Sequence, residues 1–331
     1  MRNRLVRWML ADARLNDEAA LRLFGPAPHG PRPAGLLLYT LLATVLITGV
    51  MVVGHAAGIR GQTLSAQAFA SLYHPVIIGQ AIVSAVVITL GLHIIPALRR
   101  RGTWDHIRAT SGGSRAGVRA AWAHIVYHRA SRLLMVLTYA PRVFLFALLL
   151  YDLTSFRGDY LAQVIGVHNP SIPAALDVPL MGLIVTAAFV LPFTAIGLEA
   201  AFALLLSTFF RSRQTIGMVQ TGLILARAAW AAAPVLILGE MVVRAGTGDT
   251  ISALGGWTAG FASTVLGDWG LSGLHAAELD RLWRLIPFAA LIPALAVVAA
   301  VAQSVLTILV LHWTARRAQR LDLSSVYGLI G

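Results

Sequence analysis

Two ionisable side chains, Glu199 and Arg227, lie deep inside apolar stretches, where a charge is costly unless it has a partner or a function. The two stretches are expected to form a hairpin that turns near Arg213. Glu199 lies 14 residues before this point and Arg227 lies 14 residues after it. At about 1.5 Å of helix rise per residue both side chains reach the same depth. The spacing predicts an ion pair across the hairpin, and we favour a structural role for it over a contact with substrate.

Histidines are the other side chains suited to hold a cofactor or a metal ion. A haem in a membrane needs two axial ligands at matching depth, which His93 and His312 could offer. His124 and His128 have the i, i+4 spacing of metal ligands on a helix, but the segment is strongly basic and no acidic residue lies close by. We interpret histidines at helix ends as interfacial polar residues, and expect neither a metal site nor a cofactor in this chain.

Several classes of catalytic chemistry lack the residues that they need. The sequence has no cysteine, which excludes disulfides, thiolate metal sites and cysteine nucleophiles. It has no lysine, so it cannot contain the Gly-x-x-x-x-Gly-Lys-Ser/Thr loop that binds nucleotide phosphates. The Gly-x-Ser-x-Gly elbow of serine hydrolases does not occur either. We therefore expect no catalytic residue in this chain.

The composition indicates a protein whose solvent is lipid. Of 331 residues, 57% are hydrophobic and only 12% are charged, whereas soluble domains carry about 25% charged residues. The net charge of +12 would suit a nucleic-acid partner in a soluble chain. Here the arginines flank apolar stretches, so they indicate orientation in a membrane and no nucleic-acid partner. Residues 1–34 are charged and interrupted, which predicts a cytoplasmic or interfacial helix and no signal peptide.

Six apolar stretches are long enough to cross a bilayer, for which a helix needs about 20 residues. They predict spans at 35–57, 73–98, 133–152, 178–210, 216–243 and 285–313. The remainder divides into a cytoplasmic loop at 99–132, an outer segment at 244–284 and a cytoplasmic tail at 314–331. Glycines and Trp257, Trp269 and Trp283 in the outer segment favour short helices that lie at the interface or dip into the membrane. The predicted fold is all-α, a polytopic membrane protein with about six transmembrane helices.

The arginines predict the orientation through the positive-inside rule. With the N-terminus inside, 19 of the 26 basic residues fall on the cytoplasmic side and 5 on the outer side. Arg142 and Arg227 lie within spans. We expect Arg142, which follows Pro141, to extend its side chain toward the cytoplasmic boundary. Both termini are therefore predicted to be cytoplasmic.

The segment after the second span has the pattern of a short helix that docks on a partner. Three arginines end the span, Gly102 interrupts it, and Thr103 can cap a new helix. Trp104, Ile107 and Arg108 then share one face through their i, i+3, i+4 spacing. A short helix beneath a bundle suits a groove on a cytoplasmic partner. The alternative is a solvated inner loop.

Two stretches resemble the type 2 ATP-binding-cassette (ABC) permeases. The run GTWDHIRAT at 102–110 is similar to the loop that follows the second span in this family. The run GLEAAFALLLSTFFRSRQT at 197–215 is similar to the family's small- and leucine-rich helix end, which closes with Ser, an aromatic residue and Arg-Ser. Six spans with both termini inside also fit. Where the family usually has a proline after Thr110, this chain has Ser111 and Gly112.

The resemblance implies that residues 102–110 form a coupling helix seated in a cleft of a separate ATPase subunit. Its apolar anchors would be Trp104 and Ile107, and its polar rim would be Asp105 and Arg108. The chain would then be the permease subunit of an ABC exporter in the bacterial cytoplasmic membrane. A second permease chain, identical or related, would face it, and ATP and Mg²⁺ would belong to the ATPase.

Two other functions stay open on the sequence alone. The chain could be a structural or anchoring subunit of a membrane complex that transports nothing. It could also be a haem-binding membrane electron carrier, for which His93 and His312 would supply the ligands. The sequence does not indicate a substrate, so lipids, drugs, peptides and polysaccharides are all compatible with it.

Overall fold

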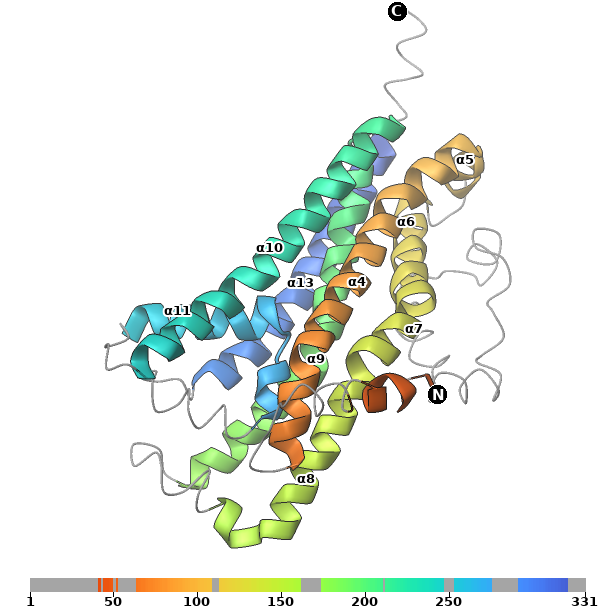
Figure 1. The fold of residues 1–331 in the computed structure, drawn as a ribbon. Helices are drawn as coiled ribbons and strands as arrows, with labels where there is room; N and C mark the ends of the chain where they lie inside the picture. The colour runs from red at the N-terminus through yellow and green to blue at the C-terminus, as the bar shows by residue number, and fades with distance from the viewer. Residues whose placement is uncertain are drawn as a thin grey trace, which may run out of the picture.

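The computed structural model describes residues 41–42, 44–49, 52, 64–108, 113–161, 174–210, 212–246, 253–275 and 291–320. Throughout these ranges the backbone is helical or forms short turns, without a strand, as the predicted all-α class requires. Five helices within them are long and apolar enough to cross a membrane (Figure 1). Most of the predicted span 35–57, the N-terminal region 1–34 and the end of the tail, 321–331, lie outside the described residues.

Four of the five long helices are uninterrupted and coincide with predicted spans. They are α4 (Leu64–Arg100), α9 (Ala174–Ser207), α10 (Arg213–Gly246) and α13 (Leu291–Arg320). Each exceeds the about 20 residues that a bilayer requires, so it either tilts or projects beyond the hydrocarbon core. Their outward side chains are apolar, as at Leu225 and Val298, which is the surface that lipid favours.

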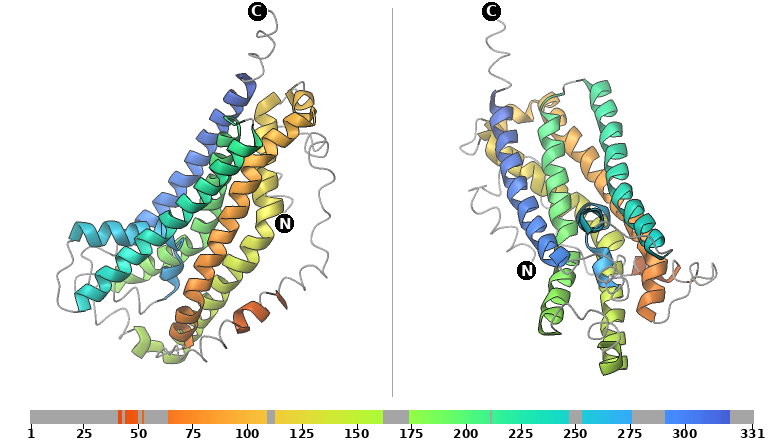
Figure 2. Two further views of the ribbon diagram at one scale, coloured as in Figure 1. Left: turned by 45° about the horizontal axis from the view of Figure 1, so that its top comes forward. Right: turned by 90° about the vertical axis from the view of Figure 1, so that its left-hand side faces the viewer.

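The central helix of the bundle is α9, which packs along α13 and along α4. Figures 1 and 2 show these three helices side by side. Small residues allow the close approach: a Cβ atom on Gly91 of α4 would lie only 2.5 Å from the Cβ atom of Ala203 in α9. Buried aliphatic side chains such as Val87 and Ile196 fill the remaining space. Close packing of this kind, rather than hydrophobic burial, is what holds helices together within lipid.

The third long helix begins well before its predicted span. The sequence predicts a loop over 99–132, but most of that region is helical, because Ala116 and Ala120 are buried while Arg115 faces outward. Charged residues lower the mean hydropathy of such a helix and conceal it from a search for apolar stretches. The helix consists of α6 (Gly113–Ala123), the π-helix η1 (His124–Ala130), α7 (Ser131–Leu134), the π-helix η2 (Met135–Tyr139) and α8 (Ala140–Leu161).

The segment at 244–284, which the sequence predicts to be the outer segment, contains short helices in its described part, as its composition predicts. These are α11 (Ala253–Ala262), the π-helix η4 (Ser263–Gly267) and the 3₁₀-helix η5 (Leu271–Leu274). In the right-hand view of Figure 2, α11 is seen end-on while the long helices run along the page, so it crosses them. Trp269 is only 1% exposed. The turn that carries it packs into the bundle, as in the second of the two arrangements that the composition favours, a segment that dips inward.

Candidate functional site

An ion pair joins α9 to α10. Arg227 Nε of α10 lies 2.5 Å from Glu199 Oε1 of α9. The structure thus brings together the two residues that the sequence pairs by their equal distance from Arg213. Their side chains are 16% and 17% exposed, respectively. Separating two charges in surroundings of low polarity is costly, so this pair fixes how far the two helices slide along each other.

Arg227 also contacts the short helices of the outer segment. Its Nη1 donates to the carbonyl oxygen of Leu266 at 3.2 Å, and its guanidinium carbon lies 5.1 Å from the ring centroid of Trp269. Such a position over an aromatic ring is favourable for a cation. Glu199 uses only one carboxylate oxygen: Oε2 is buried and has no hydrogen-bond partner among the described residues. The pair therefore leaves one strong acceptor unused.

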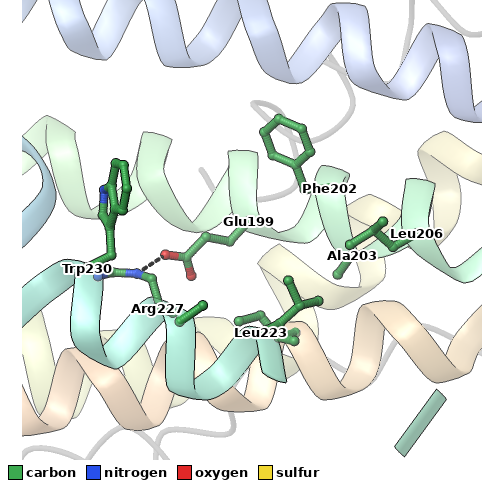
Figure 3. A pocket seen from close by; sticks show the side chains of 9 residues that line it. Glu199, Phe202, Ala203, Leu206, Leu223, Arg227 and Trp230 are labelled. Atoms are coloured by element: carbon green, nitrogen blue, oxygen red, sulfur yellow. Dashed lines mark hydrogen bonds and ion pairs between the residues drawn. The ribbon is translucent and has the colours of Figure 1, made fainter. Parts of the chain in front are cut away.

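A cavity of about 310 Å³ lies beside this pair, between α9, α10 and α4. Apart from the two charged residues its walls are apolar, and they include Phe202, Leu223 and Trp230. Figure 3 shows the Glu199 carboxylate between the Trp230 and Phe202 side chains, with the Arg227 guanidinium against it. The arrangement combines an apolar container with one charged, directional group, which is the usual composition of a small-molecule site.

A second polar cluster surrounds Arg142, and here the sequence-based expectation is wrong. The side chain does not extend to the cytoplasmic boundary but is completely buried. Its Nη2 donates to the carbonyl oxygens of Asp268 at 2.8 Å and Trp269 at 3.3 Å, and its Nη1 donates to that of Thr138 at 3.1 Å. Gln80 Nε2 donates to the same Asp268 oxygen at 3.0 Å. Main-chain carbonyls accept from both Nη atoms, so these need not reach water, while Nε is buried and has no hydrogen-bond partner among the described residues.

The turn that presents these carbonyls is organised by Asp268. Its carboxylate accepts hydrogen bonds from the backbone nitrogens of Gly270 at 2.9 Å and Ser272 at 3.0 Å, and from the Tyr73 hydroxyl at 3.4 Å. Trp269 and Gly270 have φ values of 52° and 77°, in the left-handed region that favours glycine. The hydrogen bonds of the carboxylate hold this strained turn in place, so its carbonyl oxygens stay aimed into the bundle.

Sequence reasoning missed this cluster because nothing near Arg142 in the chain supplies its partners. The two carbonyls that Nη2 meets are 126 and 127 residues away. Two signals were available: an arginine inside an apolar stretch, and the run Asp268-Trp269-Gly270, which is typical of a tight turn. Neither signal indicates that the two features meet.

A short helix lies within the predicted range 102–110, as α5 (Thr103–Arg108). Gly102, with φ 67°, ends α4 and redirects the chain. Trp104 and Ile107 are buried, and a Cβ atom on Gly117 of α6 would lie 2.8 Å from the Ile107 side chain. The implied role of these two residues as anchors on a partner is therefore wrong for this conformation, because their apolar face already covers α6.

The other predicted residues of α5 are distributed differently. Asp105 and His106 are exposed, Thr103 is half-buried, and Arg108 ends the helix. A partner that approaches α5 from outside the bundle would thus meet a polar surface at positions 105 and 106. This surface is small, so recognition there would depend on charge and hydrogen bonding.

Three of the histidines that the sequence singles out contact other side chains of the protein. His93 Nε2 lies 2.9 Å from Gln220 Oε1. The rings of His124 and His128 are 5.8 Å apart, and Arg129 Nε donates to His124 Nε2 at 3.3 Å. In the part of the chain that the structure describes, no three His, Asp or Glu side chains are grouped to hold a metal ion.

Comparison of the chain with protein-family models, with curated proteins and with solved structures gives no match. Its function must therefore be argued from the sites themselves. Three features call for an explanation: the ion pair with its cavity, the buried Arg142 cluster, and the corner that α5 forms at one end of the bundle.

Proposed function

We propose that this chain is the transmembrane permease subunit of an ABC exporter and couples ATP hydrolysis by a separate subunit to movement of a substrate. The resemblance of 102–110 and 197–215 to type 2 ABC permeases suggests this function. The observation that carries it is the attachment of α5, which follows α4 directly and packs on α6, the start of the third long helix.

The corner around α5 is suited to transmit a displacement. Gly102 connects α5 directly to α4, and Trp104 and Ile107 seat it on α6, the start of the third long helix. Ser114 Oγ of α6 donates to the carbonyl oxygen of Ala315 in α13 at 3.1 Å. Because packed interiors move as units, a push on α5 would shift all three helices together.

The charges support a cytoplasmic position for this corner. In Figure 1 the ends of α4 and α13 and the start of α10 lie at the same end of the bundle as α5. The sequence places several arginines at these helix ends. They include Arg100, Arg101, Arg213, Arg316 and Arg320. The positive-inside rule assigns such an end to the cytoplasm, where a partner ATPase and its ATP and Mg²⁺ would be found. The membrane would be the bacterial cytoplasmic membrane.

In the proposed cycle two permease chains, identical or related, bind two ATPase subunits. Closure of the ATPases on ATP presses on the exposed side of α5 at Asp105 and His106. The displacement favours one of two packings of the bundle, so the substrate path opens to the other side of the membrane. ATP binding supplies the difference in free energy between the two states.

The test uses the full chain, tagged and solubilised in a mild detergent. We expect a subunit with a nucleotide-binding lysine loop to copurify and the complex to hydrolyse ATP. Exchanging Asp105→Arg together with His106→Glu should reduce the copurified ATPase activity about tenfold, because charge reversal at an interface costs more than 1 kcal/mol. Gln319→Glu is the control, since it changes an exposed residue of α13 at the same end.

Three results would redirect the assignment. If no such subunit copurifies and deletion leaves ATP-dependent transport intact, the permease function is wrong. If the subunit copurifies but the α5 variant hydrolyses ATP normally, the chain is an anchoring subunit instead. A haem absorption band in the purified chain, lost on changing His93 or His312, would indicate the electron carrier.

A further inference from the structure

The cavity beside Glu199 exists because the hairpin of α9 and α10 is open. Although the two helices follow each other in the chain, α10 packs mainly on α4 and on η4 and not on α9. The space of about 310 Å³ between them is spanned by the ion pair. Natural sites for small molecules have volumes of about 300–1,000 Å³, so a molecule of modest size fits.

The depth of the cavity selects apolar ligands. Glu199 and Arg227 each lie 14 residues from the turn of the hairpin, which is about 21 Å along a helix. This distance places them within the hydrocarbon core, whose full thickness is about 30 Å. Phe202 and Trp230 line the cavity and are 44% and 63% exposed. A ligand can therefore enter sideways from the lipid and leave its chain against aromatic and aliphatic walls.

The ion pair provides one unused hydrogen-bond acceptor at this depth. Oε2 of Glu199 is buried without a partner among the described residues. Arg227 cannot turn to it freely, because its guanidinium is held by Glu199 Oε1, by Leu266 and by the Trp269 ring. Water is scarce in the hydrocarbon core, and an unsatisfied charged oxygen there is costly. A donor group on a ligand removes that cost.

We infer that the cavity binds an amphiphile whose head is a hydrogen-bond donor, a hydroxyl or an ammonium group, and whose body is a hydrocarbon chain or ring. The donor meets Glu199 Oε2, which a small rotation of the carboxylate turns from its buried position toward the cavity, and the body fills the space among Phe202, Leu223 and Trp230. The proposal that this cavity is a binding site depends only on the cavity itself. As the class of transported substrate it rests on the proposed function.

Binding is tested with the purified full chain in detergent, without an ATPase, by quenching of tryptophan fluorescence. Two probes have a head that donates hydrogen bonds, 11-bromoundecylammonium and 11-bromoundecanol. Methyl 11-bromoundecanoate can only accept hydrogen bonds, and 1-bromoundecane can neither donate nor accept them. We expect saturable quenching in which both donors bind about tenfold more tightly than 1-bromoundecane, as a hydrogen bond to a charged group predicts. Equal affinity of the two donors shows recognition of the donor, and preference for ammonium shows a contribution of charge.

Two variants locate the site. In Glu199→Gln the amide oxygen still accepts from Arg227, while an NH₂ group, a hydrogen-bond donor, replaces Oε2. The variant should therefore bind the methyl ester, a hydrogen-bond acceptor, more tightly than the two donor probes. Ala226→Phe places a ring in the cavity from an exposed position that lines it and should abolish saturable quenching. Ala228→Phe is the matched control: it is exposed on the same helix but does not line the cavity, and should bind like the wild type.

Equal quenching by all four probes in the wild type, or saturable quenching that survives Ala226→Phe, would overturn the proposal. The first result would mean that the cavity holds lipid tails only. Trp230→Phe checks the reporter and should remove much of the saturable signal. Because this assay contains no ATPase, its failure leaves the coupling proposal intact, and failure of the copurification leaves the binding site intact.

Discussion

Arg142 and Arg227 show two ways of stabilising an arginine at membrane depth. Arg227 has a carboxylate partner on the neighbouring helix, and its position can be inferred from the spacing of the hairpin. Arg142 instead meets three main-chain carbonyl oxygens, two of them from the turn at Asp268. A carbonyl is available at every residue, so nothing in the side-chain sequence identifies it as a partner. The guanidinium nevertheless forms a polar link between the third long helix and the turn at Asp268.

We expect Arg142→Met to destabilise the protein by about 3 kcal/mol, because the variant leaves buried carbonyls and the Asp268 carboxylate without their cation. Thermal unfolding in detergent, followed by loss of the monodisperse peak in size-exclusion chromatography, measures the effect. Arg320→Met, at an exposed position, is the control and should unfold like the wild type. A variant at 142 as stable as this control would show that the contacts contribute nothing.

At the scale of elements, two glycines with left-handed backbone conformations position α5 and the turn that contacts Arg142. Gly102 turns α4 into α5, and Gly270 forms the turn that meets Arg142. Their surroundings differ: a Cβ atom on Gly102 would meet nothing within 4 Å, whereas one on Gly270 would lie 2.9 Å from the Cα atom of Ala188 in α9. Gly102 is thus required for conformation alone, and Gly270 for conformation and close approach.

Alanine at these two positions should therefore have unequal effects. Gly102→Ala is expected to cost about 1 kcal/mol, the ordinary penalty of a left-handed residue with a side chain. Gly270→Ala should cost about 3 kcal/mol, since the methyl group also collides with the backbone of α9. Thermal unfolding of the two variants side by side measures the difference. Equal losses would contradict the close packing of the turn on α9.

For the whole molecule, the testable quantity is its orientation. The chain lacks cysteine, so single cysteines report position without background. We expect His106→Cys and Gln319→Cys to react with a membrane-impermeant maleimide only after the cells are permeabilised. Leu64→Cys, exposed at the other end of α4, should react in intact cells. The cysteine-free parent is the control, and the reverse pattern would invert the topology and exclude the proposed contact between α5 and a cytoplasmic ATPase.

The hydropathy of the sequence and the spacing of its residues predict those parts of the fold that are determined by residues close together in the chain. The apolar stretches gave the all-α membrane class and the positions of α4, α9, α10 and α13, because burial in lipid requires such stretches. The Glu199–Arg227 pair followed from counting residues around one turn. α6 was not predicted, since Arg115 and its basic neighbours hide a helix whose inner face is small and apolar.

What could not be predicted depends on contacts between distant segments. Trp104 and Ile107 form an apolar face that would fit a partner or the chain itself, and only the position of α6 decides between them. Tryptophan is a residue type typical of membrane interfaces, but the turn at Asp268 places Trp269 inside the helix bundle. In each case the residue type was informative about polarity, and the missing information was the identity of the covering surface.

The bonds of Arg142 also affect the order in which the molecule is made. Asp268 is the 126th residue that the ribosome adds after Arg142. During that interval the guanidinium has neither of the two carbonyl oxygens that Nη2 later contacts. We expect the third long helix to stay near the translocon, or near the membrane surface, until the outer segment emerges. In ribosome-bound chains of increasing length, the cross-linking partners of Arg142→Cys should change only after the outer segment has emerged. Cross-linking partners that do not change with chain length would contradict this expectation.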